Sequence, residues 1–116
     1  MIITRIYTGT DGETYFEDVN FPLKDHGMIG FMSDPIDTKS IIFRETAADY
    51  DYKWHNAPSR RYMIILEGDV KFTVSSGEER SFFAGDVVLL EDTDGKGHYS
   101  QTISNTVRKS IFVLLD

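Results

Sequence analysis

Residues 54–68 read WHNAPSRRYMIILEG, and residues 85–98 read GDVVLLEDTDGKGH. The first stretch places His55 ahead of an apolar run that ends at Gly68. The second begins with a glycine, continues as an apolar run, and reaches His98 through a glycine-containing turn. Short apolar runs bounded by turn residues are typical of buried β-strands. Each stretch therefore predicts a strand whose adjoining loop carries a histidine.

The same pattern of short strands extends along most of the chain and predicts an all-β fold. Tight-turn signals stand at Gly68-Asp69 and at Ser76-Gly77. No window has the spacing and caps of a helix. Closely spaced short strands are typical of a sandwich or barrel. We expect strands at residues 2–7, 14–19, 29–32, 40–46, 62–67, 70–75, 80–83, 87–91, 98–104 and 108–115.

The composition limits the classes of partner and chemistry. A chain of 116 residues is long enough for one domain with one core. The absence of cysteine excludes disulfides and thiol chemistry. A net charge of -7 opposes binding to nucleic acid, because a polyanion is repelled by that field. No run reaches transmembrane length, and the first residues are too polar for a signal peptide. We therefore expect a cytoplasmic protein without a membrane or nucleic-acid partner.

Residues 20–39 interrupt the strand pattern and predict a long loop. The segment contains two prolines and two glycines and has no sustained period. Loops of this length in a compact domain are often functional, so the segment is either a lid or a strap across one end of the barrel. We expect one domain, residues 1–116, in which residues 1–39 form N-terminal strands and a covering loop and residues 40–115 form the core barrel.

The spacing within the first stretch resembles the first motif of the cupin family. That motif runs His-x-His, three or four residues, Glu, six residues and Gly. Here His55, Ala57, Arg61 and Gly68 occupy those places. The resemblance implies a small single-domain cupin of uncharacterised activity. Its fold would be a double-stranded β-helix, which is a jelly-roll barrel.

The second stretch resembles the second cupin motif, which runs Gly, five residues, Pro-x-Gly, two residues and His. Gly85 begins the motif and Glu91 replaces the proline. Gly95 and His98 complete it after a two-residue insertion in the turn. The resemblance covers residues 40–115. It implies the fold more strongly than the activity, because this scaffold hosts many unrelated functions.

In metal-binding cupins three histidines and a glutamate hold a divalent metal, which implies His55 and His98 as metal ligands here. The other two ligand places carry Ala57 and Arg61. A guanidinium has no acceptor atom, and its charge opposes a divalent cation. Two neutral histidines fall short of the three protein ligands that catalytic sites generally have. We expect no tightly held metal cofactor, with a divalent metal at the two histidines as the alternative.

A metal-free pocket is the second interpretation of the same residues. Arg61 could grip a carboxylate or phosphate through two parallel hydrogen bonds. His55 and His98 could act as general acid and base, because imidazole titrates near neutral pH. The candidate catalytic residues are thus His55, His98, Arg61 and Tyr62.

Several neighbours complete the candidate pocket. An aromatic wall, a hydroxyl and further charged groups would come from the candidate ligand-binding residues Trp54, Arg60, Arg61, Tyr99 and Asp92. Asp92 could orient His98 or Arg60, as carboxylates do for imidazoles and guanidiniums. Arg61 could instead form an ion pair with Glu45, Glu67, Glu91 or Asp92. Strand alternation places Tyr62 on the face opposite Arg61 unless a bulge intervenes.

Three functions remain open at this point. The first is a metal-free or weakly metal-binding isomerase, cyclase or lyase acting on a small organic acid. The second is a metal-dependent enzyme, such as a dioxygenase, that uses His55 and His98. The third is a ligand-binding or sensing module without catalysis. Each would hold a small molecule in the barrel.

Two segments, residues 63–66 and 111–115, are apolar at consecutive positions. Strands of this kind are buried on both faces, so the sheet needs a cover on its outer side as well. Oligomerisation commonly provides such a cover. The sequence therefore predicts a homodimer.

Overall fold

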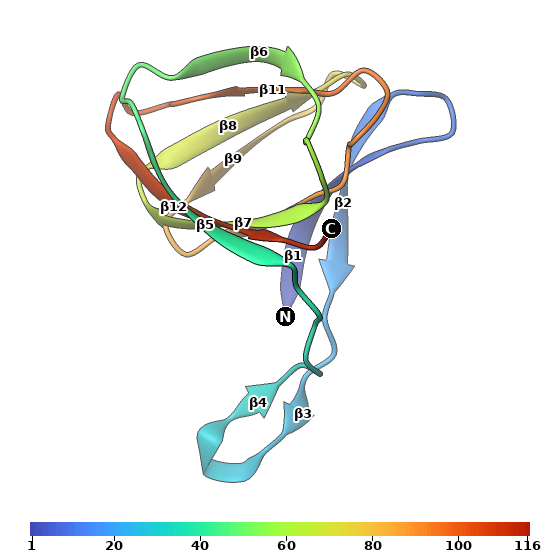
Figure 1. Cartoon of the computed structure of the whole chain (residues 1–116), viewed down its shortest axis with the longest axis vertical. Helices are drawn as coiled ribbons and strands as arrows, with labels where there is room; N and C mark the ends of the chain where they lie inside the picture. The colour runs from blue at the N-terminus through green and yellow to red at the C-terminus, as the bar shows by residue number, and fades with distance from the viewer.

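The computed structural model describes residues 1–116 as an almost entirely β-stranded chain with one short 3-10 helix, η1 (Gly27–Ile29) (Figure 1). No helix has the length and hydropathy needed to cross a membrane. The strands are β1 (Ile2–Thr8), β2 (Thr14–Asn20), β3 (Lys24–Asp25), β4 (Phe31–Met32), β5 (Ser40–Thr46), β6 (Asp51–His55), β7 (Arg61–Glu67), β8 (Asp69–Val74), β9 (Glu79–Phe83), β10 (Val87–Leu90), β11 (His98–Gln101) and β12 (Arg108–Leu114).

Two facing sheets enclose the core (Figure 1). The larger has the order β2-β1-β10-β7-β12-β5, and the smaller has the order β6-β11-β8-β9. Neighbouring strands are antiparallel except for β1 and β10, which run parallel. Apolar side chains from both sheets form one buried cluster: Ile6, Ala57, Met63, Ile65, Val70, Phe72, Val74, Phe82, Val88 and Leu90. The predicted all-β cupin architecture is confirmed in its strand content and two-sheet form.

Strand alternation decides which side chains reach the interior. Along β7, Arg61, Met63 and Ile65 are buried, while Tyr62 and Ile64 between them are half-buried and face outward. In antiparallel sheets directly paired residues point to the same face. The pairing of Met63 with the inner residues of β12 and β10 therefore extends this division across the sheet.

Most of the expected strands are present with ends shifted by a few residues, but two differences are informative. The strand β6 was missed because it is a polar edge strand whose outer side chains lie in solvent. The strand expected at residues 29–32 is wrong. Gly27–Ile29 form η1, and only Phe31–Met32 pair with Lys24–Asp25.

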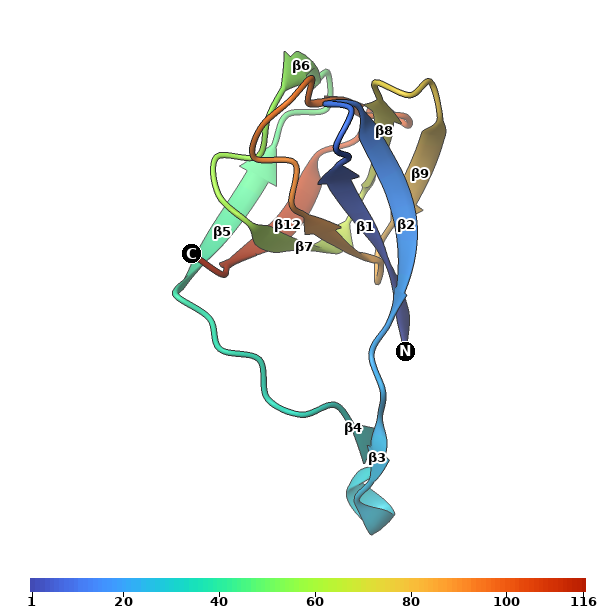
Figure 2. The same ribbon diagram turned by 90° about the vertical axis from the view of Figure 1, so that its right-hand side faces the viewer.

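Residues 21–39, here called the arm, do not cover the barrel. The arm leaves β2, turns back through the β3–β4 hairpin and η1, and projects away from the two sheets (Figure 2). The expected covering loop is therefore wrong for this segment. The expected start of the barrel at residue 40 is also wrong, because β1 lies within the larger sheet and its Ile6 is fully buried in the core.

Candidate functional site

A small cavity of about 60 Å³ lies between the two sheets, lined along the larger sheet from Arg61 at the start of β7 to Arg108 at the start of the antiparallel β12. His55, His98 and Arg61 line it, which brings together three of the four candidate catalytic residues of the sequence analysis. The full lining is Arg44, Tyr50, His55, Asn56, Ala57, Pro58, Arg61, Met63, Phe72, Leu90, His98, Ser100, Arg108 and Phe112.

His98 is held by a buried carboxylate. Its Nδ1 lies 2.5 Å from Oδ2 of Asp92, and both side chains are almost completely buried. A carboxylate accepts hydrogen bonds only, so Nδ1 carries a proton and Nε2 is left for the cavity. The expectation that Asp92 orients His98 is met by this geometry, whereas Arg60 makes no contact with Asp92.

His55 lies beside His98 with the same tautomer. Its Nδ1 is 2.7 Å from the carbonyl oxygen of Lys53, so this nitrogen donates and Nε2 is free. The two ring centroids are 4.4 Å apart, and the rings meet edge to face. Burial lowers the pKa of His55 below its usual value of 6.5. His55 is therefore neutral at pH 7, and two imidazoles offer free nitrogens to one small cavity.

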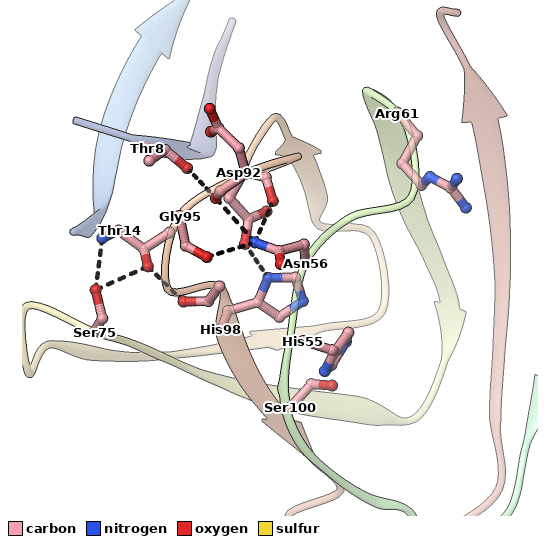
Figure 3. A network of polar contacts seen from close by, with 12 residues as sticks. Thr8, Thr14, His55, Asn56, Arg61, Ser75, Asp92, Gly95, His98 and Ser100 are labelled. Carbon is pink, nitrogen blue, oxygen red and sulfur yellow. Dashed lines mark hydrogen bonds and ion pairs between the residues drawn. The ribbon is translucent and has the colours of Figure 1, made fainter. Parts of the chain in front are cut away.

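The turn that carries His98 is fastened to its surroundings (Figure 3). The amide of Asn56 donates to the carbonyl oxygens of Asp92, Asp94 and Gly95 at 3.3, 2.9 and 3.3 Å. Thr14 donates to the carbonyl oxygen of Gly97. Gly97 has φ of 75°, and a Cβ at this position would collide with the backbone of His55. The glycine thus permits the close approach that sets the two histidines side by side.

Arg61 points into the cavity without a counter-ion. It is 8% exposed and donates to the backbone and hydroxyl oxygens of Ser59 at 3.0 and 3.1 Å. None of the carboxylates proposed for an ion pair reaches it. Glu91 binds Arg5 and Arg60, while Asp92 binds His98. Burial and the nearby charge of Arg44 lower the pKa of Arg61.

Arg108 is the most buried arginine in the chain, and the sequence analysis did not identify it. It is 1% exposed, and its Nε and Nη1 have no hydrogen-bond partner. Only Nη2 makes a long hydrogen bond, 3.5 Å, to the hydroxyl of Thr46. Burial and then the charge of Arg44 lower its pKa. A buried donor without a partner loses its hydration without compensation, so this side chain costs free energy in the folded chain.

Arg44 completes a cluster of three guanidiniums stacked on aromatic rings. It lies 5.3 Å from the ring centroids of both Tyr50 and Phe112. Arg61 lies 5.0 Å from the ring of Phe112, and Arg108 lies 5.1 Å from that of Tyr50. Cation–π contacts of this kind attenuate the repulsion but leave the charges in place. The three guanidiniums outnumber the carboxylates around them: Asp92 is bound to His98, and Asp69, whose charge acts on Arg108, accepts hydrogen bonds from the backbone amides of Ile103 and Ser104. The cavity is therefore positive.

Tyr62 does not reach the cavity. Its ring lies on the outer face of the larger sheet, 6.2 Å from the ring of Phe21. The expectation that Tyr62 is a catalytic residue of the pocket is therefore wrong. The physical reason is the period of two along β7, which the sequence analysis had noted for this residue.

Four of the five expected ligand-binding residues do not line the cavity: Asp92, which binds His98, and Trp54, Arg60 and Tyr99. Trp54 is half exposed and packs edge to face on Tyr99, whose neighbour His98 points inward. The hydroxyl of Tyr99 donates to Asp51 instead. Arg60 lies on the surface, where it binds Glu91 at 3.0 Å and Asp116 at 2.9 Å. The expected placement of Trp54, Tyr99 and Arg60 in the pocket is therefore wrong. Each stands next to a residue that points inward, and adjacent residues point to opposite sides.

Arg44 and Arg108 carried a weak sequence signal. Both stand in expected strands, and the register pairs Arg44 with Ser110 and Arg108 with Thr46 on the inner face. Strand alternation alone could not place these two side chains in the interior. Apolar residues alternate with them along the same strands, and apolar residues are ordinarily assigned to the core.

The donor set does not fit a tightly bound divalent metal. No group of three His, Cys, Asp or Glu side chains converges anywhere in the structure. At the cavity only His55 and His98 offer free ligand atoms, and three guanidiniums surround them. Positive charge at this density opposes a dication.

Comparison with known families agrees with the two-sheet fold. The EutQ-like cupin domain family matches residues 44–110. The chain is a EutQ-like cupin. The match includes the first motif, the second motif and all three arginines of the cavity. No curated protein matched the sequence significantly.

Three solved structures resemble this cupin. The protein NMB1881 from Neisseria meningitidis has a TM-score of 0.53 and 17% identity over 70% of this chain and 79% of its own. The capsular polysaccharide assembling protein CapF from Staphylococcus aureus has a TM-score of 0.49 and 14% identity over 84% of this chain and 30% of its own. A putative ethanolamine utilization protein Q from Salmonella typhimurium has a TM-score of 0.45 and 17% identity over 99% and 95%. At these identities the first likeness supports the fold alone.

Proposed function

We propose that this cupin binds a small organic anion in its barrel, with the anionic group among the guanidiniums of Arg44, Arg61 and Arg108. The observation that carries the proposal is Arg108, a completely buried cation with two unpartnered donors at a cavity that has no free carboxylate. A buried unsatisfied donor costs about 1–3 kcal/mol, and more when it is charged. A bound anion would satisfy these donors and the charge together.

The cavity limits the size of the bound group. Its volume of about 60 Å³ is far below the roughly 300 Å³ of an ordinary small-molecule pocket. The enclosed space therefore suits a carboxylate or phosphate head rather than a whole apolar acid. Planar guanidiniums bind such heads through pairs of parallel hydrogen bonds, which orient the group as well as hold it.

The histidine pair supports proton-transfer chemistry on that anion. Nε2 of His98, oriented by Asp92, can remove a proton from the carbon next to a carbonyl or carboxylate group. The electron pair left on that carbon moves onto the oxygen, where Arg61 stabilises the charge. His98 then returns the proton to the opposite face of the same carbon or to the far end of a conjugated double bond, and the oxyanion reverts to the carbonyl. This sequence describes an isomerase, and lyase or cyclase steps begin in the same way without a redox partner.

Binding is tested by isothermal calorimetry and thermal shift with acetate, malonate and inorganic phosphate. We expect at least one of these probes to bind, and Arg61→Ala to weaken it by about 10- to 100-fold, as expected for loss of charged hydrogen bonds. Arg60→Ala is the matched control, because it removes the adjacent surface guanidinium. Equal affinities for wild type and both variants would contradict the proposal, as would no binding of any probe.

Catalysis and simple binding separate at His98. If the protein is an enzyme, His98→Gln abolishes proton exchange at the carbon next to the carboxylate of a bound probe, measured by NMR in D2O, while affinity changes little. If wild type binds the probe without exchange, the ligand-binding module is the better description. Elemental analysis of protein purified without a tag tests the metal-dependent alternative. A stoichiometric transition metal would contradict the metal-free site.

A further inference from the structure

The cavity has room only for the head of the proposed anion, so the rest of the ligand has to lie outside it. The lining residues that keep contact with solvent show where the cavity opens. Arg44, Tyr50 and His55 are half-buried, and Pro58 is exposed. They belong to β5, to β6 and to the segments that follow these two strands. β5 and β6 end their respective sheets and do not pair with each other (Figure 1). The cavity therefore opens toward this unpaired side of the barrel.

A β-bulge in β6 directs two side chains toward this opening. The register pairs His55 with His98 and Tyr52 with Ser100, so two residues of β6 lie opposite one residue of β11 between these pairs. Directly paired residues point to the same face, and both partners in β11 line the cavity. Tyr52 thus faces the same side as His55, whereas a regular strand would place residues three apart on opposite faces. Bulges are common beside functional sites, where they redirect a side chain.

Tyr52 lies at the boundary between the cavity and solvent. Its ring centroid is 3.9 Å from that of His55, and the two rings meet edge to face. Its ring also stacks on that of Tyr50, with centroids 6.1 Å apart and an interplanar angle of 19°. Both neighbours line the cavity, yet Tyr52 is 51% exposed. A tyrosine held by two other rings, with half of its surface free, offers a fixed aromatic surface at the mouth of the site.

On the basis of the proposed function, we propose that Tyr52 packs against a flat aromatic tail of the bound anion, whose head lies among the three guanidiniums. The ligand is then an aromatic organic acid or an aromatic phosphate ester. An aromatic tail gains offset or edge-to-face contacts with a tyrosine beyond the burial of its area, which a saturated tail does not. The tail leaves the cavity beside His55, so the atoms that join head and tail lie next to the imidazoles.

Paired probes that share a head and a charge measure the contribution of the tail alone. Isothermal calorimetry compares methyl phosphate with phenyl phosphate, and acetate with phenylacetate. We expect the aromatic member of at least one pair to bind the wild type about tenfold more tightly than its small partner. Cyclohexylacetate should gain less than phenylacetate, because its saturated ring has the area but no π-face.

Variants of β6 assign the gain to one side chain. Tyr52→Ala should remove most of the tenfold difference and change affinity for the small probes by less than about twofold. Retained affinity for the small probes also shows that this variant is folded. Tyr52→Phe should keep the difference, because it keeps the ring. Trp54→Ala is the matched control, since Trp54 stands on the same strand and is also 51% exposed but packs on Tyr99 outside the cavity.

The outcomes separate this tail site from the anion site itself. If no small probe binds, the proposed function is contradicted and the tail site falls with it. If the small probes bind but the aromatic probes gain nothing, or if Tyr52→Ala keeps the gain, only the tail site is overturned. A gain lost in Trp54→Ala instead would overturn it as well, and an equal gain for cyclohexylacetate would overturn the aromatic class. If Tyr52→Ala does not fold, Tyr52→Leu replaces it, because leucine keeps apolar bulk without an aromatic face.

Discussion

At β5 and β12 the two faces of the larger sheet have opposite chemistry in the reverse of the usual order. On β5 and β12 the residues that face the interior include Arg44 and Arg108, while their neighbours Phe43 and Ile111 face outward. Soluble sheets ordinarily bury the apolar side and expose the charged one. Both choices here cost free energy in the isolated chain, because a buried guanidinium loses water and an exposed phenyl ring orders it. These two costs are offset only if a ligand binds at the inner face and a partner covers the outer face.

The smaller sheet shows what the ordinary arrangement looks like in the same domain. Val70, Phe72 and Val74 of β8 point inward and are almost completely buried with Phe82 of β9. This half of the interior stabilises the fold, whereas the arginine half destabilises the empty protein. The core and the arginine cavity share one interior space, and Met63, Phe72 and Leu90 belong to both.

The largest effect that would sharpen this comparison comes from two phenylalanines. Phe72→Ala should lower the free energy of unfolding by about 3–5 kcal/mol, because it empties part of the close-packed core. Phe43→Ala should change it by less than about 0.5 kcal/mol when measured at concentrations where the protein is monomeric. Urea unfolding measures both values. Similar losses for the two variants would mean that the outer face is covered within one chain.

The next largest effect is expected at Arg108. Arg108→Met keeps most of the side-chain length and removes a buried charge whose donors are unpartnered. The empty protein should therefore gain about 1–3 kcal/mol in stability. Affinity for a carboxylate or phosphate probe should fall by about 100-fold or more. Thermal unfolding and calorimetry on the same sample measure the two changes.

Opposite signs in these two measurements distinguish a binding residue from a structural one. A structural arginine would lose stability when replaced, because its removal would leave partners unsatisfied. A loss of stability with unchanged affinity would therefore contradict the role proposed for Arg108. Arg80→Met is a suitable control, because Arg80 binds Asp18 and Glu78 at the surface, away from the cavity.

The smallest expected effect concerns His55 and pH. Its lowered pKa means that the unfolded chain binds more protons than the folded one below pH 6.5. Stability from this residue is complete above that pH and is lost as pH falls toward the folded pKa. An NMR titration of the His55 ring should give a pKa below 6.5. Saturation with phosphate should raise it, because a nearby anion favours the imidazolium. A pKa above 6.5 in the free protein would contradict the buried placement.

Much of the fold was predictable because it depends on local signals. Alternating and apolar runs indicated most strands, and glycines such as Gly68 indicated the turns between them. The grouping of His55, His98 and Arg61 at one cavity was likewise predictable from the spacing of two motifs. The edge strand β6 was not predicted, because an edge strand with a solvated face needs no apolar pattern.

The sequence by itself determined most of the strands along the chain, the cupin motifs and the loss of two metal-ligand positions. Only the tertiary structure decided that Arg44 and Arg108 join Arg61 inside and that Tyr62, Trp54 and Tyr99 stay outside. It also decided that residues 21–39 form a projecting arm. The physical reason is that a strand has two faces related by a single residue step. Where arginines lie on the inner face and apolar side chains on the outer face, the sequence pattern cannot show which face is the interior. Only the pairing of strands that are distant in the sequence decides it.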